Sequence, residues 1–268
     1  MDANGTNERI RTKDREDGKE RGGADGATVD RQAFSDRKAL EAACREAIGD
    51  RPAGLCEPDV AARLAATAGI SVASWRFVSK EEDLAQASAQ VGYPLVLKVA
   101  SPDISHKSDV GGVQVGIGDE AQLVAAYHTM MERLGETVPD AAIEGVTLHA
   151  QHRGVELALG ANRDAQFGPV VMFGVGGLFV ELYQDVVFRV APFDESDALD
   201  ALSEIKAQAL LNGFRGLPTV DRKAVALAGV GLGRLMLSCP RIAEVDLNPV
   251  IVSGADVIAV DVRVVLSN

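Results

Sequence analysis

Residues 95–115 read LVLKVASPDISHKSDVGGVQV, and this stretch decides how the rest of the chain is interpreted. The apolar run at 95–100 predicts a β-strand, although Lys98 interrupts it. A polar loop follows that carries His106 and ends in Gly111 and Gly112, and the next apolar run predicts a second strand. The stretch therefore predicts two strands flanking a loop, with a cation in one strand and an imidazole in the loop.

The lysine and the histidine each allow two interpretations. Lys98 either faces solvent from an edge strand or reaches a phosphate group from a rigid strand, because buried lysines are rare unless they are paired. His106 is either a solvated loop residue or a nucleophile that carries a phosphoryl group. Gly111 and Gly112 allow a close turn and can present amide groups to an anion. The choice between these interpretations depends on evidence for a nucleotide site elsewhere in the chain.

Composition and charge restrict the class of this 268-residue chain. Abundant Val, Ala, Leu and Gly favour alternating strands and helices, so we predict an α/β (α+β) fold. The net charge of −12 argues against a nucleic-acid partner. The chain has no apolar run of the roughly 18 residues that span a membrane, so we expect no membrane role. Three cysteines without metal-ligand spacing are typical of a reducing cytosol, and we predict a cytoplasmic protein.

The two ends of the chain differ in composition. Residues 1–38 are charged and glycine-rich and lack the apolar segment of a signal peptide, so they predict a disordered solubilising tail. Residues 39–268 predict the folded part of the chain, with helices and strands in alternation. Hairpins are too frequent there for a purely parallel sheet, which indicates a mixed architecture.

The segment EVDLNPV near the carboxyl terminus has the most informative spacing. Asp246 and Asn248 are two residues apart and therefore face the same side of a strand. If Val252 pairs with Val257 across a turn, Asp261 lies opposite Asn248. Two carboxylates and an amide oxygen then form a ligand set for Mg²⁺, which commonly shares its coordination shell with phosphates. The alternative is that these residues only form a turn, since Asn-Pro is a loop signal.

Four segments, taken in order, resemble the ATP-grasp domain of the NDP-forming acyl-CoA synthetases: KVASPDISHKSDVGGV, GVELALGANRDAQFGPVVMFGVGGLFVE, FRVAP and EVDLNPV. The resemblance is to the β subunit of ADP-forming acetate–CoA ligase and, more distantly, of succinyl-CoA synthetase. It extends over about residues 45–268. It implies an ATP-grasp fold in which a first subdomain at about 50–145 and a second at about 146–268 clamp a nucleotide.

The resemblance also implies a role for individual residues. Lys98 matches the lysine that contacts ATP phosphates, and Glu156 matches the acidic residue of the nucleotide pocket. Leu148 lies in the segment that matches the linker whose backbone meets adenine. Asn248 and Asp261 match the Mg²⁺ ligands, with Asp246 beside them, and the loop glycines Gly111 and Gly112 give the phosphate room. His106 matches the histidine that relays phosphate in the acetate-type branch.

The implied cofactors are ATP or ADP and Mg²⁺, and the implied partner is an α subunit that carries the CoA-binding and ligase domains. CoA, the carboxylic acid and phosphate reach the reaction through that partner. The chain departs from the resemblance in the segment LHAQHRGVE, where many members of the family carry a Gln and a Met-Ala-Pro-like segment, so His149 and His152 are unusual there. This departure leaves the choice between adenine and guanine open.

Three functions fit these observations. The first is the β subunit of an ADP-forming acyl-CoA synthetase with a phosphohistidine relay at His106. The second is a non-catalytic ATP-grasp module that only binds nucleotide. The third is another ATP-grasp ligase that joins a carboxylate to an amine, which needs no histidine in this loop. Formation of phosphohistidine distinguishes the first from the other two.

Overall fold

The structure is a computed structural model that describes residues 31–104, 106–177, 185–214 and 216–268. The side chains of residues 31–36 are outside this description. The helices are α1 (Arg31–Ile48), α2 (Pro58–Thr67), η1 (Glu81–Asp83), α3 (Leu84–Val91), α4 (Glu120–Thr137), α6 (Glu195–Glu204), α7 (Gln208–Leu211) and α8 (Arg222–Ser238). The strands are β1 (Gly54–Leu55), β2 (Ser71–Val72), β3 (Trp75–Val78), β4 (Leu95–Ala100), β5 (Val113–Ile117), β6 (Gly145–Ala150), β7 (Val155–Asp164), β8 (Gly168–Val175), β9 (Val186–Val190), β10 (Ile242–Ser253), β11 (Asp256–Ala259) and β12 (Val262–Leu266).

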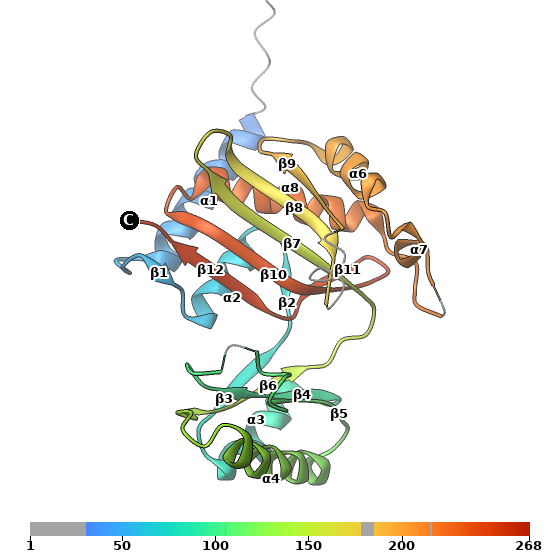
Figure 1. Cartoon of the computed structure of the whole chain (residues 1–268). Helices are drawn as coiled ribbons and strands as arrows, with labels where there is room; N and C mark the ends of the chain where they lie inside the picture. Colours follow the sequence, from blue (N-terminus) through green and yellow to red (C-terminus); the bar gives the residue numbers. More distant parts are fainter. Residues whose placement is uncertain (1–30, 105, 178–184, 215) are drawn as a thin grey trace, which may run out of the picture.

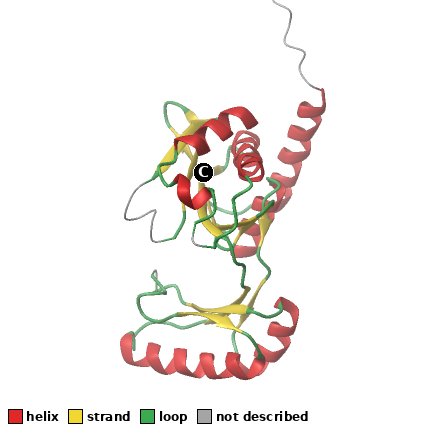
Figure 2. Cartoon of the chain, turned by 90° about the vertical axis from the view of Figure 1, so that its right-hand side faces the viewer, coloured by secondary structure: helices red, strands yellow, loops and turns green. Residues whose placement is uncertain are grey.

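The strands form two sheets, and each sheet organises one subdomain (Figure 1). The small subdomain contains the antiparallel sheet β3-β6-β4-β5, with α3 and α4 on the face turned away from the rest of the molecule. The large subdomain contains the sheet β1-β12-β10-β7-β8-β9, to which β11 and β2 are added. Figure 2 shows that the helices of the large subdomain gather on one side of its sheet. The other face of the large sheet, which we call the open face, has no described helix packed on it.

Alternation along the central strands explains why one face is covered. In β7, Val155, Leu157 and Leu159 are buried in the core beneath α8, while Glu156 between them is exposed. Helix α8 is buried over most of its length, as its continuous apolar sequence predicts. It begins where the Asp221 carboxylate accepts hydrogen bonds from the backbone N–H groups of residues 223 and 224.

The structure corrects the predicted subdomain boundaries. The buried residues between Cys44 and Ile70 pack in the core of the large subdomain rather than the small one, and β1 pairs with β12 at the other end of the chain. Strand β6 belongs to the small sheet, so the small subdomain extends from Trp75 to Ala150. The small subdomain is therefore inserted between two parts of the large one. The prediction failed because consecutive segments were assumed to share a subdomain, whereas strand pairing joins segments far apart in sequence.

The predicted onset of order at residue 39 is also corrected. Helix α1 begins at Arg31, and Cys44, Ala47 and Ile48 anchor its carboxyl-terminal end in the large core. Residues 31–38 therefore continue a helix that is already anchored, even though they are too polar to bury a core of their own. Residues 1–30 of the predicted tail lie outside the described part of the chain.

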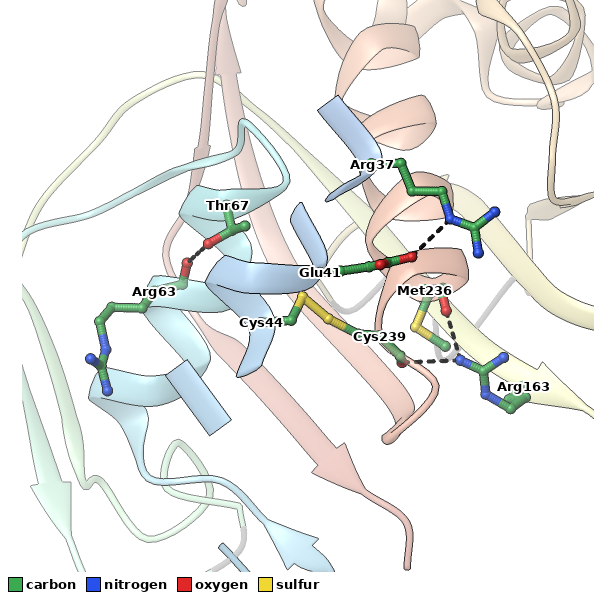
Figure 3. Close-up of a disulfide and its surroundings, with 8 residues drawn as sticks. All are labelled: Arg37, Glu41, Cys44, Arg63, Thr67, Arg163, Met236 and Cys239. Atoms are coloured by element: carbon green, nitrogen blue, oxygen red, sulfur yellow. Dashed lines mark hydrogen bonds and ion pairs between the residues drawn. A yellow bond between two sulfur atoms is a disulfide. The ribbon is translucent and has the colours of Figure 1, made fainter. Parts of the chain in front are cut away.

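A disulfide that the sequence interpretation did not anticipate fixes α1 to the rest of the large subdomain (Figure 3). Cys44 of α1 is bonded to Cys239, which follows α8, and their Cα atoms are 6.1 Å apart. Beside the bond, Arg163 donates hydrogen bonds to the carbonyl oxygens of Met236 at 2.7 Å and Cys239 at 3.2 Å. Cys56 is a buried free thiol. The sequence interpretation had treated all three cysteines as unpaired, and the structure pairs two of them.

None of the helices in the described part of the chain combines the length and hydropathy that a membrane crossing requires.

Candidate functional site

A cleft of about 750 Å³ lies between the small sheet and the open face of the large sheet. Both subdomains contribute to its walls, because the cleft-facing residues of β4 and β5 lie across from those of β7 and β10. The predicted residues that line it are Lys98, His106, Glu156 and Asp261. The structure thus brings together four residues that are up to 163 positions apart in sequence.

Lys98 points into this cleft from β4. Its neighbours Leu97 and Val99 are buried in the small core, so alternation along the strand turns Lys98 to the opposite face. The Nζ atom lies 3.2 Å from Oδ2 of Asp261, and the lysine side chain is 13% exposed. Strand β4 is paired on both sides, by β6 and β5. The interpretation of Lys98 as a solvent-facing residue of an edge strand is therefore wrong.

The His106 loop is closed by its own backbone. His106 is exposed and lines the cleft, and its carbonyl oxygen accepts a hydrogen bond from Asp109 N at 3.2 Å. The N–H groups of Gly111 and Gly112 donate to Ser108 O at 3.2 Å and to Lys107 O at 2.7 Å. In this conformation those two amides are engaged within the loop, which corrects the expectation that they face an anion.

Gly112 has a packing role instead. A Cβ atom there would lie 2.5 Å from Cγ1 of buried Val99 and 3.0 Å from the Lys107 carbonyl oxygen. Val99 N donates to Gly112 O at 2.8 Å. The glycine therefore lets the end of the loop sit directly against β4, which sets the loop beside Lys98.

The segment predicted to meet the nucleotide base is displaced by a few residues. Leu148 is fully buried in the small core and its backbone pairs with both neighbouring strands, so the structure does not bring it to the cleft. Ala150, Gln151 and His152 line the cleft in its place. The Gln151 side-chain oxygen accepts a hydrogen bond from Gly116 N at 2.8 Å, which ties this segment to β5.

Glu156 lies on the cleft wall opposite the small sheet. It pairs with Ile251 in neighbouring β10, and both residues line the cleft. The glycine-rich bend after β8 passes directly over Glu156: Gly176 N donates to Glu156 O at 2.8 Å, and a Cβ atom on Gly177 would lie 2.5 Å from Glu156 Oε2. The GVGG sequence is thus a close-approach bend that leaves the Glu156 carboxylate on the cleft side.

The hairpin predicted to hold a metal has the expected register. Val252 pairs with Val257, and Val260 N donates to Pro249 O at 3.0 Å. Asp261 and Asn248 each adjoin one of these hydrogen-bonded residues, and Asp261 lines the cleft. Asn248 is not among the residues that line the cleft, although its neighbour Pro249 is. A carboxylate and an amide oxygen are ligand types that suit Mg²⁺, which takes few protein ligands and keeps the rest of its shell for water and phosphate.

Asp246 lines a different hollow from Asp261. It lies opposite Gly160 of β7 and Arg263 of β12, and it shares its hollow with Met172 and Phe188. Burial raises the pKa of Asp246, and the charges of Glu244 and Asp261 add to the rise. Two residues along a strand are separated by roughly 6–7 Å, so sharing a face does not place Asp246 at the same ligand site as Asn248.

His149 is a cleft-side residue that the sequence marked only as unusual. Its Nε2 lies 3.0 Å from Thr147 Oγ1, its ring stacks on Trp75 at 6.2 Å, and it lines a hollow of about 120 Å³ together with Lys98 and Asp261. Its Nδ1 atom is buried and has no hydrogen-bond partner among the described residues. Burial, with a further contribution from Lys98, lowers the pKa of His149 to about 4, so the ring is neutral at pH 7. Strand alternation could have found it, since Val146 and Leu148 face the core.

Comparison with known proteins agrees with this geometry. The profile of the ATP-grasp domain matches residues 50–266. The β subunit of ADP-forming acetate–CoA ligase I from Pyrococcus furiosus is 41% identical over 230 residues, which are 85% of this chain and 98% of that subunit. Acetate–CoA ligase I from Archaeoglobus fulgidus is 41% identical over 199 residues, which are 74% of this chain and 29% of that longer chain.

A solved structure has the same arrangement. Acetyl-coenzyme A synthetase 1 of Candidatus Korarchaeum cryptofilum, in complex with coenzyme A and Mg-AMPPCP, gives a TM-score of 0.67 at 38% identity, covering 86% of this chain and 100% of that one. Its phosphohistidine segment points towards the nucleotide-binding site. Sequence, fold and cleft geometry agree: this chain belongs to the ATP-grasp family, in the branch formed by the nucleotide-binding domains of ADP-forming acyl-CoA ligases.

Proposed function

We propose that this chain is the nucleotide-binding β subunit of an ADP-forming acid–CoA ligase. The reaction is acyl-CoA + ADP + phosphate ⇌ carboxylic acid + CoA + ATP. The observation that carries the proposal is that His106, Lys98, Glu156 and Asp261 line one cleft. A cation, an imidazole and two carboxylates at a cleft between two sheets are suited to phosphoryl transfer, which depends on positioning and charge neutralisation.

Each residue has a proposed task. Lys98 binds phosphate oxygens, and Glu156 binds nucleotide hydroxyl groups at the other end of the cleft. Ala150, Gln151 and His152 border the base. Asn248 and Asp261 hold Mg²⁺, which supplies neutralising charge to the phosphates when it is bound. Lys98 and Asp261 contact each other in this structure, so nucleotide binding replaces their ion pair with separate contacts to phosphate and metal.

His106 is the proposed phosphoryl carrier. Its imidazole is exposed on a loop beside Lys98, so it can face either the nucleotide or a second protein. We propose that it accepts the phosphoryl group of an acyl phosphate and donates it to ADP, with the histidine regenerated after each turnover. The acyl phosphate arises on an α subunit that carries the CoA-binding and ligase domains. ADP and CoA are cytoplasmic metabolites, so we expect the enzyme to act in the cytoplasm.

Formation of phosphohistidine tests this function. Incubation with Mg-[γ-³²P]ATP should label the unaltered chain with acid-labile, base-stable phosphate. His106→Ala should abolish both this label and ligase activity assayed with the α subunit. His128→Ala is the matched control, because His128 is an exposed histidine of α4 that pairs with Glu81 outside the cleft. Full labelling and activity in the His106→Ala variant would disprove the relay and favour a module that binds nucleotide without carrying phosphate.

A further inference from the structure

The open face of the large sheet carries an apolar patch that the nucleotide site does not use. The patch consists of Val170 and Met172 of β8 with Phe188 and Val190 of β9, which lie directly opposite one another in the strand register. Phe188 is 54% exposed and Val190 is 47% exposed. Exposed apolar residues that are contiguous, rather than scattered singly, are typical of protein interaction sites.

The geometry of the patch suits a docked protein segment. Strand β9 is the last strand of the described sheet, and no described strand pairs with its outer edge. A hollow of about 200 Å³ separates the patch from β10 and has Met172 and Phe188 on one side. Glu244 and Asp246 line the other side, with Arg263 paired to Glu244 at 3.4 Å. The two carboxylates outnumber the single guanidinium, so that side of the hollow is acidic. A protein segment that complements the patch and the hollow is therefore apolar and carries an adjoining basic residue.

The hollow beside the patch and the nucleotide cleft both have β10 in their walls. Asp246 at the margin of the patch precedes Asn248 by two residues in β10, and Gly160 beside the patch and Glu156 in the cleft both belong to β7. A protein seated on the patch therefore lies next to the proposed metal ligands without covering the Glu156 end of the cleft.

We infer that this patch is the docking surface for the α subunit, through an apolar segment that carries a basic residue. The inference rests on the proposed function, since it assumes a separate catalytic partner. The Archaeoglobus fulgidus relative supports the choice of occupant: the region similar to this chain is 29% of its length, so that region and the rest of the ligase belong to one polypeptide there. A second copy of this chain is the competing occupant, and the test below distinguishes the two.

The test compares exposed positions in the patch with an exposed position on the opposite side of the sheet. Phe188→Asp places a charge in the patch, and Val190→Asp is a second variant at the same edge. Leu227→Asp is the matched control, because Leu227 is 47% exposed on α8, on the helix-covered side. The probe is the recombinant α subunit of the same organism, defined as the chain that restores acid–CoA ligase activity. Association is measured by biolayer interferometry and Mg-ADP binding by calorimetry.

Both patch variants should bind the α subunit at least tenfold more weakly and need more of it for activity, whereas Leu227→Asp should match the unaltered chain. All variants should bind Mg-ADP equally, which shows that they are folded. Unchanged association in both patch variants, or an equal loss in the control, would overturn the inference. A dimer of the unaltered chain in sedimentation that Phe188→Asp dissociates, with α-subunit binding retained, would assign the patch to a second copy. If the unaltered chain fails to bind Mg-ADP, the proposed function fails, while the association measurements still decide the docking surface.

Discussion

Lys98→Met separates the stabilising role of one lysine from its binding role. Lys98 Nζ is 3.2 Å from Asp261 Oδ2, and this ion pair joins the small subdomain to the large one. The Asp261 side chain is 62% exposed, so water solvates the carboxylate when the lysine is removed. Ion pairs of this kind contribute about 0–1 kcal/mol, and methionine retains the apolar stem of the lysine. We expect the free energy of unfolding to fall by less than about 1 kcal/mol.

The effect on nucleotide affinity should be larger. A hydrogen bond between a charged donor and a phosphate oxygen contributes about 1.5–3 kcal/mol, because both groups are charged. At about 1.4 kcal/mol for each factor of ten, the Kd for Mg-ADP should rise roughly 10- to 150-fold. The variant should therefore remain folded and lose most of its nucleotide binding.

Calorimetric titration with Mg-ADP and urea denaturation measure the two quantities on the same samples. Lys80→Met is the control, because Lys80 forms an exposed ion pair with Glu82 at 3.4 Å away from the cleft. Its Kd for Mg-ADP should equal that of the unaltered chain. A Lys98→Met variant whose Kd stays within about threefold of the unaltered value, well below the range expected from a charged hydrogen bond, would refute the role of Lys98 in phosphate binding.

Three further predictions concern stability. Because burial lowers the pKa of His149 to about 4, the unfolded chain takes up a proton near pH 6.5 that the folded chain excludes. Stability should be fully present above pH 6.5 and fall by up to about 3 kcal/mol towards pH 4; His149→Gln should flatten this part of the slope in urea titrations, and an unchanged slope would count against it. Gly229→Ala should cost about 1–3 kcal/mol because its Cβ overlaps a buried phenylalanine ring. Gly135→Ala, on an exposed helix face with free space, should raise the free energy of unfolding by about 0.5–1 kcal/mol. If the two glycine variants shift the urea midpoint in the same direction, overlap of the added Cβ atom does not explain the effect at Gly229. Reduction of the Cys44–Cys239 bond, which spans 195 positions, should cost up to about 5 kcal/mol by chain entropy; identical midpoints with and without dithiothreitol would contradict it.

Local patterns predicted the parts of the fold that local forces determine. The register of Val252 with Val257 follows from a short turn between two apolar runs, and the structure has it. The burial of α8 follows from an apolar surface on most sides. The position of Lys98 on a strand was also predicted, and the structure adds the direction of its side chain, which depends on how β4 packs against α4 and its neighbours.

The errors arose where distant segments decide the outcome. The boundary between the subdomains depends on β1 pairing with β12, and no pattern within either strand specifies that partner. The disulfide likewise joins residues that only the packing of α1 against α8 brings together. Leu148 is different, because alternation of Val146 and Leu148 with polar residues already indicated that Leu148 faces the core. The roles assigned to Asn248 and Asp261 are predictions from the family resemblance.

The insertion of the small subdomain into the large one has a consequence for synthesis on the ribosome. The small subdomain is complete once β6 has emerged, because all the strands of its sheet lie between Trp75 and Ala150. The large subdomain must wait for β12, since Gly54 of β1 pairs with Leu266 of β12. Its amino-terminal helices and strand therefore remain without their β-sheet partners until β12 has been synthesised. The nascent chain can therefore fold the small subdomain, which forms one wall of the nucleotide cleft, before the large subdomain can form the other wall.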